Sequence, residues 1–162
     1  NGLLLRDLHN YWFSVDPVQQ LVVELTERDV LQDGDQHMAE HLHFKGVQLA
    51  IDDFGTGNTS LSWLEKLRPD VLKIDRSFTS SVGIDSVNAT VTDIIIALAN
   101  RLHIVTVAEG VETLEQENYL RSHGVDVLQG FYYARPMPVE AFPAWLASRE
   151  ESESEGESET TE

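Results

Sequence analysis

The sequence predicts an α/β fold in which short parallel strands alternate with helices. Five short runs are rich in β-branched and aliphatic residues, and the first four are nearly all apolar until their last positions. This is typical of parallel strands covered on both faces. The runs are 21–26, 47–52, 71–75, 104–108 and 126–130. Longer segments with helical spacing of apolar residues lie between them, which predicts right-handed crossovers between neighbouring strands.

The helical segments are expected at 28–44, 60–66, 86–102 and 113–123. A further helix is expected over 138–149, with Phe142, Trp145 and Leu146 on its buried face. Each segment has apolar residues that recur at the spacing of one helix face. No convincing internal repeat accompanies this alternation of strands and helices.

Composition limits the classes of function that the chain can have. Its 162 residues and 41% hydrophobic content suit one domain with a core. With 11 Lys+Arg against 28 Asp+Glu, the formal net charge is −17, which disfavours nucleic acid and membrane surfaces as partners. The absence of cysteine excludes disulfides and thiolate chemistry. No run reaches the ~18 apolar residues of a membrane span. A cytoplasmic location is expected for this segment, whereas the full-length protein can be attached to a membrane.

Two regions are expected along the chain. Residues 1–149 contain the predicted strands and helices and form the domain. Residues 150–162 alternate glutamate with Ser, Thr and Gly and contain no apolar residue, which predicts a disordered acidic tail. A solvated end without a role in chemistry is favoured over an interaction tail. The chain begins at Asn1 without a signal-like segment and is expected to be cut from a longer protein.

Polar residues end every predicted strand. Because the carboxyl ends of parallel strands meet on one face, we expect these side chains to gather there. A carboxylate at a strand end can instead cap the following helix, which is a fair explanation for one position but a poor one for five. The strand-end residues are Glu24, Asp52 and Asp53, Lys73 and Asp75, Glu109, and Gln129.

The residue types predict a divalent metal site. Four carboxylates, those of Glu24, Asp52, Asp53 and Glu109, would raise one another's pKa unless a cation neutralised them. Oxygen ligands without His or Cys suit Mg²⁺ or Mn²⁺. Two such ions can activate a water and stabilise the leaving oxygen of a phosphoryl displacement. Lys73 is placed among the acids to hold a phosphate oxygen or the attacking water by its charge.

Five motifs occur in the order found in EAL domains, and together they resemble that family over about residues 21–138. The resemblance implies a modified TIM barrel that cleaves cyclic di-GMP to linear pGpG. The motifs are Glu24-Leu25-Thr26-Glu27, Asp52-Asp53-Phe54-Gly55-Thr56-Gly57, Lys73-Ile74-Asp75, Glu109-Gly110-Val111-Glu112 and Gln129-Gly130-Phe131.

The resemblance also implies roles for individual residues. Glu24, Asp52 and Asp53 resemble the family's metal ligands, and Lys73 is similar to the lysine that orients the nucleophilic water. Glu109 resembles the glutamate that is the general base or a metal-site partner. The supporting residues implied are Glu27, which steadies the loop after Asp53, Asp75 and Glu112 as acids near the site, and Gln129 beside metal-bound water.

The chain also departs from the family pattern. The Glu-Ala-Leu signature and the asparagine ligand of the next strand are absent from these residues. A TIM barrel usually needs about 250 residues, whereas this chain has 162. We therefore expect a partial (β/α) TIM-type barrel that lacks its first strands and is weak or inactive alone. A non-catalytic EAL-like module that binds cyclic di-GMP or a protein is the alternative, and an unrelated carboxylate-rich barrel enzyme is disfavoured.

Two further groups of residues have competing interpretations. His37 and His41 share a helix face and suggest zinc, but an exposed polar face is the favoured interpretation. Tyr132 and Arg135 suit either stacking on guanine with a grip on phosphate, or packing at the barrel rim. The resemblance places the helix after the Asp53 loop in a dimer contact, so a homodimer is expected.

Overall fold

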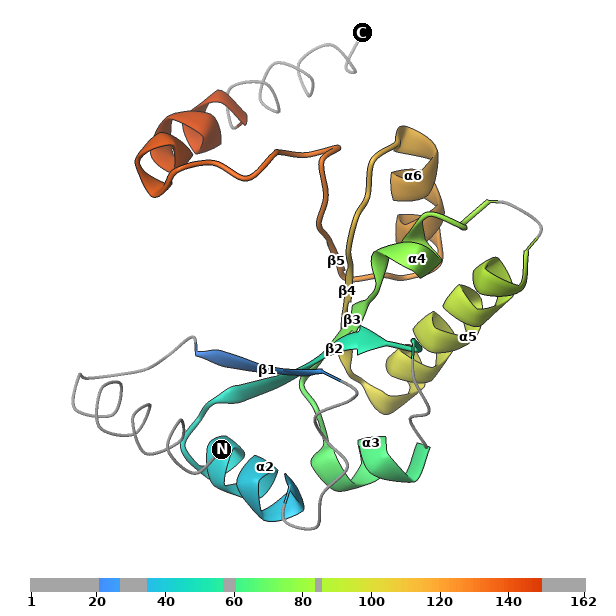
Figure 1. Cartoon of the computed structure of the whole chain (residues 1–162), viewed down its shortest axis with the longest axis vertical. Coiled ribbons are helices and arrows are strands. Elements are labelled where there is room, and N and C mark those ends of the chain that lie inside the picture. Colours follow the sequence, from blue (N-terminus) through green and yellow to red (C-terminus); the bar gives the residue numbers. More distant parts are fainter. Residues whose placement is uncertain (1–20, 27–34, 57–60, 84–85, 150–162) are drawn as a thin grey trace, which may run out of the picture.

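The computed structural model describes residues 21–26, 35–56, 61–83 and 86–149. Within them, five strands form one sheet in the order β1-β2-β3-β4-β5 (Figure 1). Every neighbouring pair is parallel, as predicted. The strands are β1 (Val22–Thr26), β2 (Gln48–Phe54), β3 (Val71–Ile74), β4 (Val105–Ala108) and β5 (Val127–Leu128).

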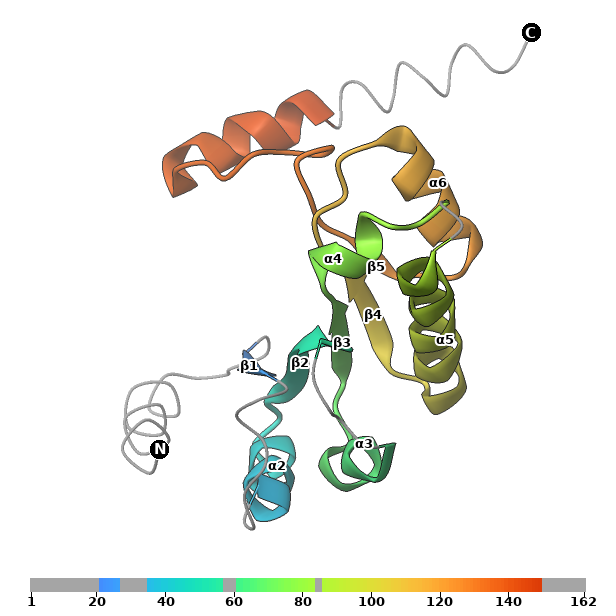
Figure 2. The ribbon, with the colours of Figure 1, turned by 45° about the vertical axis from the view of Figure 1, so that its right-hand side comes forward.

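The helices that connect successive strands lie along one side of the curved sheet (Figure 2). Most begin and end within two residues of the predicted bounds, although residues 28–34 of the first predicted helix lie outside the described part. A short helix after β3 was not predicted. The helices are α2 (Asp35–Phe44), α3 (Leu61–Leu67), α4 (Arg76–Thr79), α5 (Val87–Leu102) and α6 (Leu114–Ser122), and residues 142–149 are also helical after a 3-10 turn, η1 (Val139–Ala141).

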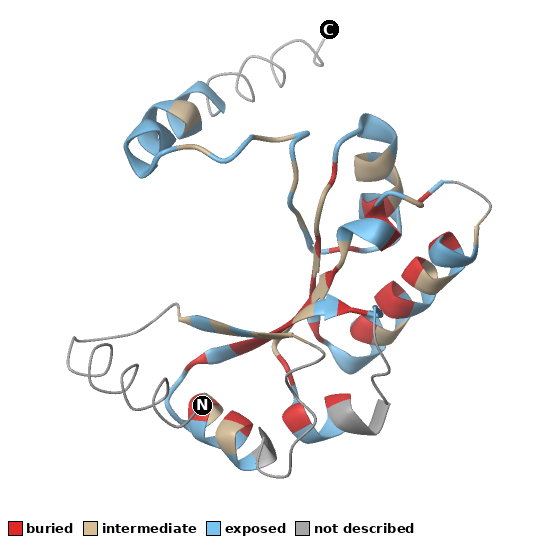
Figure 3. Cartoon of the chain, in the orientation of Figure 1, coloured by how far each residue is buried: buried red, intermediate tan, exposed pale blue. Residues whose placement is uncertain are grey.

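The hydrophobic core lies between the sheet and these helices (Figure 3). Leu49 and Ile51 of β2 and Leu72 and Ile74 of β3 are fully buried on the helix side of the sheet. Burial of each such side chain stabilises the fold by about 1.5–3 kcal/mol. This packing fixes which face of each strand the polar strand-end residues occupy.

The opposite face of the sheet is more open than the sequence predicts. Val105 of β4 and Val127 of β5 are 43% and 47% exposed. Val105 lies between the buried Ile104 and Thr106, so its side chain points away from the helices. The prediction that the first four strands are covered on both faces is therefore wrong for β4 among the described residues, because the helices described here line only one side; no such cover was predicted for β5.

The last described helix also differs from its prediction. In Figures 1 and 2 it stands away from the sheet. Phe142 and Leu146 are 48% and 42% exposed, so the predicted buried face is not buried among the described residues. Phe142 stacks on Trp145 with 5.7 Å between ring centroids, and the Arg149 guanidinium donates a hydrogen bond to the carbonyl of Tyr133.

Two aspartates tie the amino-terminal ends of the strands together. Asp70, just before β3, accepts a hydrogen bond of 2.8 Å from the Leu49 amide of β2. Asp126, just before β5, accepts hydrogen bonds of 2.8 Å from both the amide and the hydroxyl of Thr106 in β4. Sequence reasoning missed this role. The two acids lie at the end of the sheet opposite the predicted site, where they support the fold.

None of the helices in the described ranges is both long and apolar enough to cross a bilayer. The predicted tail, residues 150–162, lies outside the described part. The domain boundary before Glu150 therefore stays a prediction.

Candidate active site

The carboxyl ends of four strands converge on the ammonium group of Lys73. Its Nζ lies 2.7 Å from Oε1 of Glu109, 3.0 Å from Oδ1 of Asp52 and 3.3 Å from Oε1 of Glu24. These residues come from or directly follow β3, β4, β2 and β1 respectively. Three of the four predicted carboxylates thus meet at the predicted lysine.

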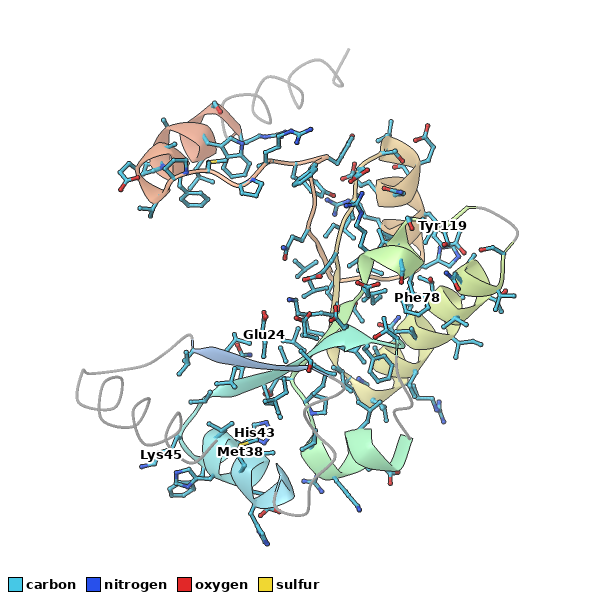
Figure 4. The ribbon with its side chains drawn as sticks, in the orientation of Figure 1. Glu24, Met38, His43, Lys45, Phe78 and Tyr119 are labelled. Carbon is cyan, nitrogen blue, oxygen red and sulfur yellow. The ribbon has the colours of Figure 1, made fainter. Side chains whose placement is uncertain are left out.

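Strand register explains this convergence. Glu24 pairs with Ala50, two residues before Asp52, and Lys73 pairs with Val107, two residues before Glu109. Side chains two apart point to the same face of a sheet. Figure 4 shows Glu24 on the side of β1 that faces away from α2, with Met38 and His43 of α2 on the other side.

A β-bulge places two acids opposite Lys73. Ile51 pairs with Leu72 and Phe54 pairs with Ile74, so β2 has one residue more than β3 in this interval. Asp52 and Asp53 together stand opposite the single residue Lys73. Such a bulge bends the strand and redirects a side chain, which is why simple alternation does not predict where both acids point.

Asp53 has a left-handed backbone with φ of 55°. This region is unfavourable for residues other than glycine by roughly 1–2 kcal/mol, although Asp tolerates it better than most. The contacts that the structure gives Asp53 involve its carbonyl, which accepts from the Thr56 hydroxyl at 2.9 Å and the Thr56 amide at 3.3 Å. Asp53 is exposed, so its predicted place among the metal ligands stays a prediction.

The turn after Asp53 packs against α5. Gly55 has φ of 95°, and a Cβ there would lie 2.9 Å from Cδ1 of Ile95 and 3.0 Å from Cε2 of Phe78. Only glycine fits this combination of conformation and space. The glycine that ends the predicted mobile loop, Gly57, lies outside the described residues.

The electrostatics of the cluster fix the charge of Lys73. Its side chain is 13% exposed, and this burial disfavours the charged ammonium. The effect is outweighed by the attraction of the Glu109 and Asp52 carboxylates next to the ammonium, so the pKa of Lys73 is raised above its ordinary value. Lys73 therefore stays a cation at any physiological pH. It can bind an anion but cannot accept a proton.

The donor set suits a hard divalent cation. Oδ1 of Asp52 is buried, with the Lys73 ammonium 3.0 Å away as an ion-pair partner. Among the described residues, no group donates a well-directed hydrogen bond to this oxygen. A buried carboxylate oxygen that accepts no hydrogen bond can bind a metal ion. The described residues nevertheless contain no group of three His, Cys, Asp or Glu placed to hold a metal ion. The carboxylates of Glu24, Asp52 and Glu109 surround the Lys73 ammonium instead.

Asp75 caps a helix in this structure. Its carboxylate accepts from the amide of Ser77 at 2.9 Å and from the Ser77 hydroxyl at 2.5 Å, which starts α4. Burial alone would raise the pKa of Asp75, but these hydrogen bonds lower it overall. Asp75 therefore has the helix-capping role that was the alternative for a strand-end acid. A further role for Asp75 beside the metal stays a prediction.

The other supporting residues lie around the same rim. Glu112 forms an ion pair of 2.7 Å with Arg76. Gln129 is exposed, and its backbone amide donates to the Ala108 carbonyl at 2.8 Å. Glu27 lies outside the described residues. The structure therefore places Glu112 and Gln129 at the rim, and their predicted roles remain predictions.

The aromatic segment after β5 lies beside the loop that follows Glu109. The guanidinium of Arg135 stacks 4.7 Å from the centroid of the Phe131 ring, and the Tyr132 amide donates to the Val111 carbonyl at 3.0 Å. Tyr132 is 37% exposed. These contacts are compatible with both interpretations of Tyr132 and Arg135, rim packing and substrate binding.

The zinc interpretation finds no support in the described part of the chain. His37 is 89% exposed at its side chain and lies 3.5 Å from Glu40 on the same helix face. No cluster of metal-ligating side chains surrounds it there. An exposed polar face, the favoured interpretation, describes this region.

Sequence reasoning missed Arg76. It follows Asp75 directly and lies at the rim of the site, where its guanidinium meets Glu112. One signal in the sequence could have identified Arg76. It is a cation directly after the strand-end acid Asp75, in a chain that has few cations.

Comparisons with known proteins extend these observations. A family model for the EAL domain matches residues 4–136. The probable cyclic di-GMP phosphodiesterase PdeD of Escherichia coli K12 is 66% identical over 146 residues, which are 90% of this chain and 27% of PdeD. The PaMucR phosphodiesterase in its c-di-GMP complex aligns with a TM-score of 0.78 and 40% identity, over 86% of this chain and 57% of that chain.

The manganese/cy-diGMP complex of Klebsiella pneumoniae BlrP1 aligns with a TM-score of 0.69 and 34% identity, over 83% of this chain and 34% of that chain. The chain spans about a quarter of the length of PdeD, at 27%. The predicted fold class is confirmed, because the parallel sheet with its helices aligns with EAL domains, which are TIM-type barrels. The chain belongs to the EAL domain family.

Proposed function

We propose that the chain forms part of a metal-dependent phosphodiesterase that hydrolyses cyclic di-GMP to linear pGpG. The observation that carries the proposal is the convergence of Glu109, Asp52 and Glu24 on Lys73 at the carboxyl ends of four parallel strands. Its support includes the identity to PdeD and the alignment with a phosphodiesterase solved with c-di-GMP.

The substrate is an anionic phosphodiester, and the chain has a formal net charge of −17. Local cations must therefore offset repulsion at the site. Lys73 is one such cation. The residues that would hold a Mg²⁺ or Mn²⁺ ion are Glu24, Asp52 and Asp53, and two ions are proposed for a site with all its ligands. A bound ion would acidify a water and neutralise charge that develops on the phosphate.

The chain's own residues supply the rest of the chemistry. Water attacks phosphorus, the bond from phosphorus to the ribose oxygen breaks, and Glu109 accepts the proton that the water loses. The leaving ribose oxygen takes a proton from solvent and Glu109 releases its proton to solvent, so the product is linear pGpG. Lys73 stays positively charged and holds the Glu109 side chain 2.7 Å from its ammonium. It also offers its charge to a phosphate oxygen.

A second candidate is a non-catalytic module that binds cyclic di-GMP or a protein partner. It is favoured by one observation, that the described carboxylates surround Lys73 and leave no group of three gathered for a metal ion. A homodimer through the region of α3 and a cytoplasmic location also remain proposals.

The two candidates differ in their need for a metal ion. The protein that carries this chain, purified at its full length, should produce pGpG from cyclic di-GMP with Mn²⁺ and lose that activity in excess chelator. Release of pGpG is followed by chromatography. Equal turnover with chelator would contradict the metal-dependent mechanism, whereas binding without pGpG in any metal would favour the second candidate.

A further inference from the structure

Arg76 occupies a fixed position beside the proposed site. It is the first residue of α4, three residues after Lys73, and the capping bonds from Ser77 to Asp75 set where this helix starts. The chain therefore turns sharply after β3. This turn places the Arg76 side chain next to the end of β4.

The aliphatic part of Arg76 packs against Gly110. Gly110 has φ of 70°, and a Cβ there would lie 2.8 Å from Cβ and 2.9 Å from Cδ of Arg76, and closer still to its Cγ. Real side chains do not approach so closely. Arg76 thus covers the backbone of the residue that directly follows Glu109.

The guanidinium of Arg76 reaches the other end of the same loop. Its Nη2 lies 2.7 Å from Oε1 of Glu112, with the two side chains 62% and 40% exposed. The contacts of Arg76 therefore reach both Gly110 and Glu112, the residues on either side of Val111. Because an exposed ion pair adds little to global stability, its effect is expected to be local.

The opposite side of the loop is held by the segment after β5. The Val111 amide donates to the Gln129 carbonyl, and the Tyr132 amide donates to the Val111 carbonyl, both at 3.0 Å. A Cβ on Gly130 would collide with the Val111 backbone. The loop of Glu109 to Glu112 is thus fixed between this segment and Arg76.

We propose that Arg76 is a positioning residue that holds the Glu109 carboxylate against Lys73. This inference rests on the proposed function, in which Glu109 accepts the proton. Glu109 is tied by its amide to the Ile74 carbonyl at 3.0 Å and by its side chain to Lys73 at 2.7 Å. A shift of Gly110 moves the adjoining Glu109, and proton transfer is sensitive to displacements of about 1 Å.

The test compares Arg76→Met with Arg76→Lys in the full-length protein with Mn²⁺. Arg76→Met keeps much of the apolar packing and removes the ion pair, so kcat should fall about tenfold, the lower end for a supporting contact. KM for cyclic di-GMP should stay within about threefold and Tm should not change. Arg76→Lys, which keeps the charge, should recover part of kcat. The matched control is Arg101→Met, an exposed arginine on the last turn of α5.

Two further measurements complete the test. If Arg76 acts through Glu112, the double variant Arg76→Met/Glu112→Gln should be no slower than Arg76→Met alone. Hydrogen exchange should accelerate at the Glu109 and Val111 amides of Arg76→Met, while the Thr106 amide, bonded to Asp126, stays protected.

These outcomes separate this inference from the proposed function. Absence of turnover in the wild-type protein would contradict the proposed function, and the exchange rates alone would then decide whether Arg76 holds the loop. With an active wild type, an Arg76→Met variant with the kcat of the Arg101→Met control overturns the inference. If the wild type is inactive, hydrogen exchange at the Glu109 and Val111 amides that is the same in Arg76→Met as in the wild type overturns the inference as well.

Discussion

Lys73 and Glu109 form the shortest of the three ion pairs of the Lys73 ammonium, with 2.7 Å between Nζ and Oε1. They come from adjacent parallel strands whose register is Lys73 to Val107. The pair joins a permanent cation to the proposed proton acceptor. Asp52 and Glu24 complete the ring of acids at 3.0 Å and 3.3 Å from the same ammonium.

Calcium should separate binding from catalysis. Mg²⁺ demands near-ideal octahedral geometry with short bonds, whereas Ca²⁺ takes longer bonds and more ligands. We expect cyclic di-GMP to bind in Ca²⁺ without turnover and to be hydrolysed when Mn²⁺ replaces Ca²⁺. Calorimetric titration and pGpG release measure the two steps. Hydrolysis in Ca²⁺ as fast as in Mn²⁺ would show that metal geometry does not control the reaction.

Removal of Asp126 should destabilise the fold far from the site. Thr106 is fully buried, and its amide and hydroxyl both donate to Asp126. Asp126→Ala leaves these donors without that partner, at a cost of about 1–3 kcal/mol for a buried unsatisfied group. Urea unfolding measures the change, with Glu140→Ala, an exposed acid of η1, as the control. Equal stability of the two variants would refute this role for Asp126.

Glycine should stabilise the chain at two left-handed positions. Arg68 and His103 have φ of 47° and 57° and lie just before β3 and β4, while Gly46 and Gly124 fill the corresponding places before β2 and β5 with φ of 76° and 85°. Arg68→Gly and His103→Gly should each raise the free energy of unfolding by about 0.5–1 kcal/mol.

The reverse change supplies the control for this prediction. A Cβ added at Gly46 would have no other atom within 4 Å, so Gly46→Ala tests the backbone conformation alone. It should lower the free energy of unfolding by about 1 kcal/mol. Urea unfolding that finds both glycine variants less stable than the wild type would show that the side chains of Arg68 and His103 outweigh their backbone strain.

The cap on α4 should weaken in acid. Hydrogen bonds from Ser77 lower the folded-state pKa of Asp75 despite its partial burial. A depressed acid pKa stabilises the fold above the unfolded-state value and loses that effect as pH falls through the folded-state value. The stability difference between wild type and Asp75→Ala should therefore shrink as pH is lowered below about 4. Urea unfolding at several pH values measures it, and a difference that grows in acid would contradict the cap.

Much of the site could be predicted because strand ends follow directly from sequence pattern. Apolar runs that end in Glu24, Asp52, Lys73 and Glu109 locate those side chains on one face once the strands are parallel. The direction of Asp53 could not be predicted in the same way, since a bulge in β2 breaks the alternation. Family resemblance supplied the substrate and the individual roles, which residue types alone left open.

Other features depend on contacts between distant residues and escaped prediction. The capping of α4 by Asp75 and the ion pair of Arg76 with Glu112 both arise from where the chain turns after β3. The apolar face of the helix predicted over 138–149 was expected to be buried, yet Phe142 remains 48% exposed. Periodicity identifies such a face but does not say what lies against it.

Glu109 and Lys73 are the residues on which the proposed hydrolysis of cyclic di-GMP depends most. Their roles are tested by the rate of pGpG formation by the full-length protein in saturating Mn²⁺, for the wild type, Glu109→Gln and Lys73→Met. We predict that Glu109→Gln lowers turnover by at least about 10²-fold while it still binds cyclic di-GMP, and that Lys73→Met also loses turnover. Near-normal turnover in the Glu109→Gln variant would contradict the proposed role of Glu109 as the proton acceptor.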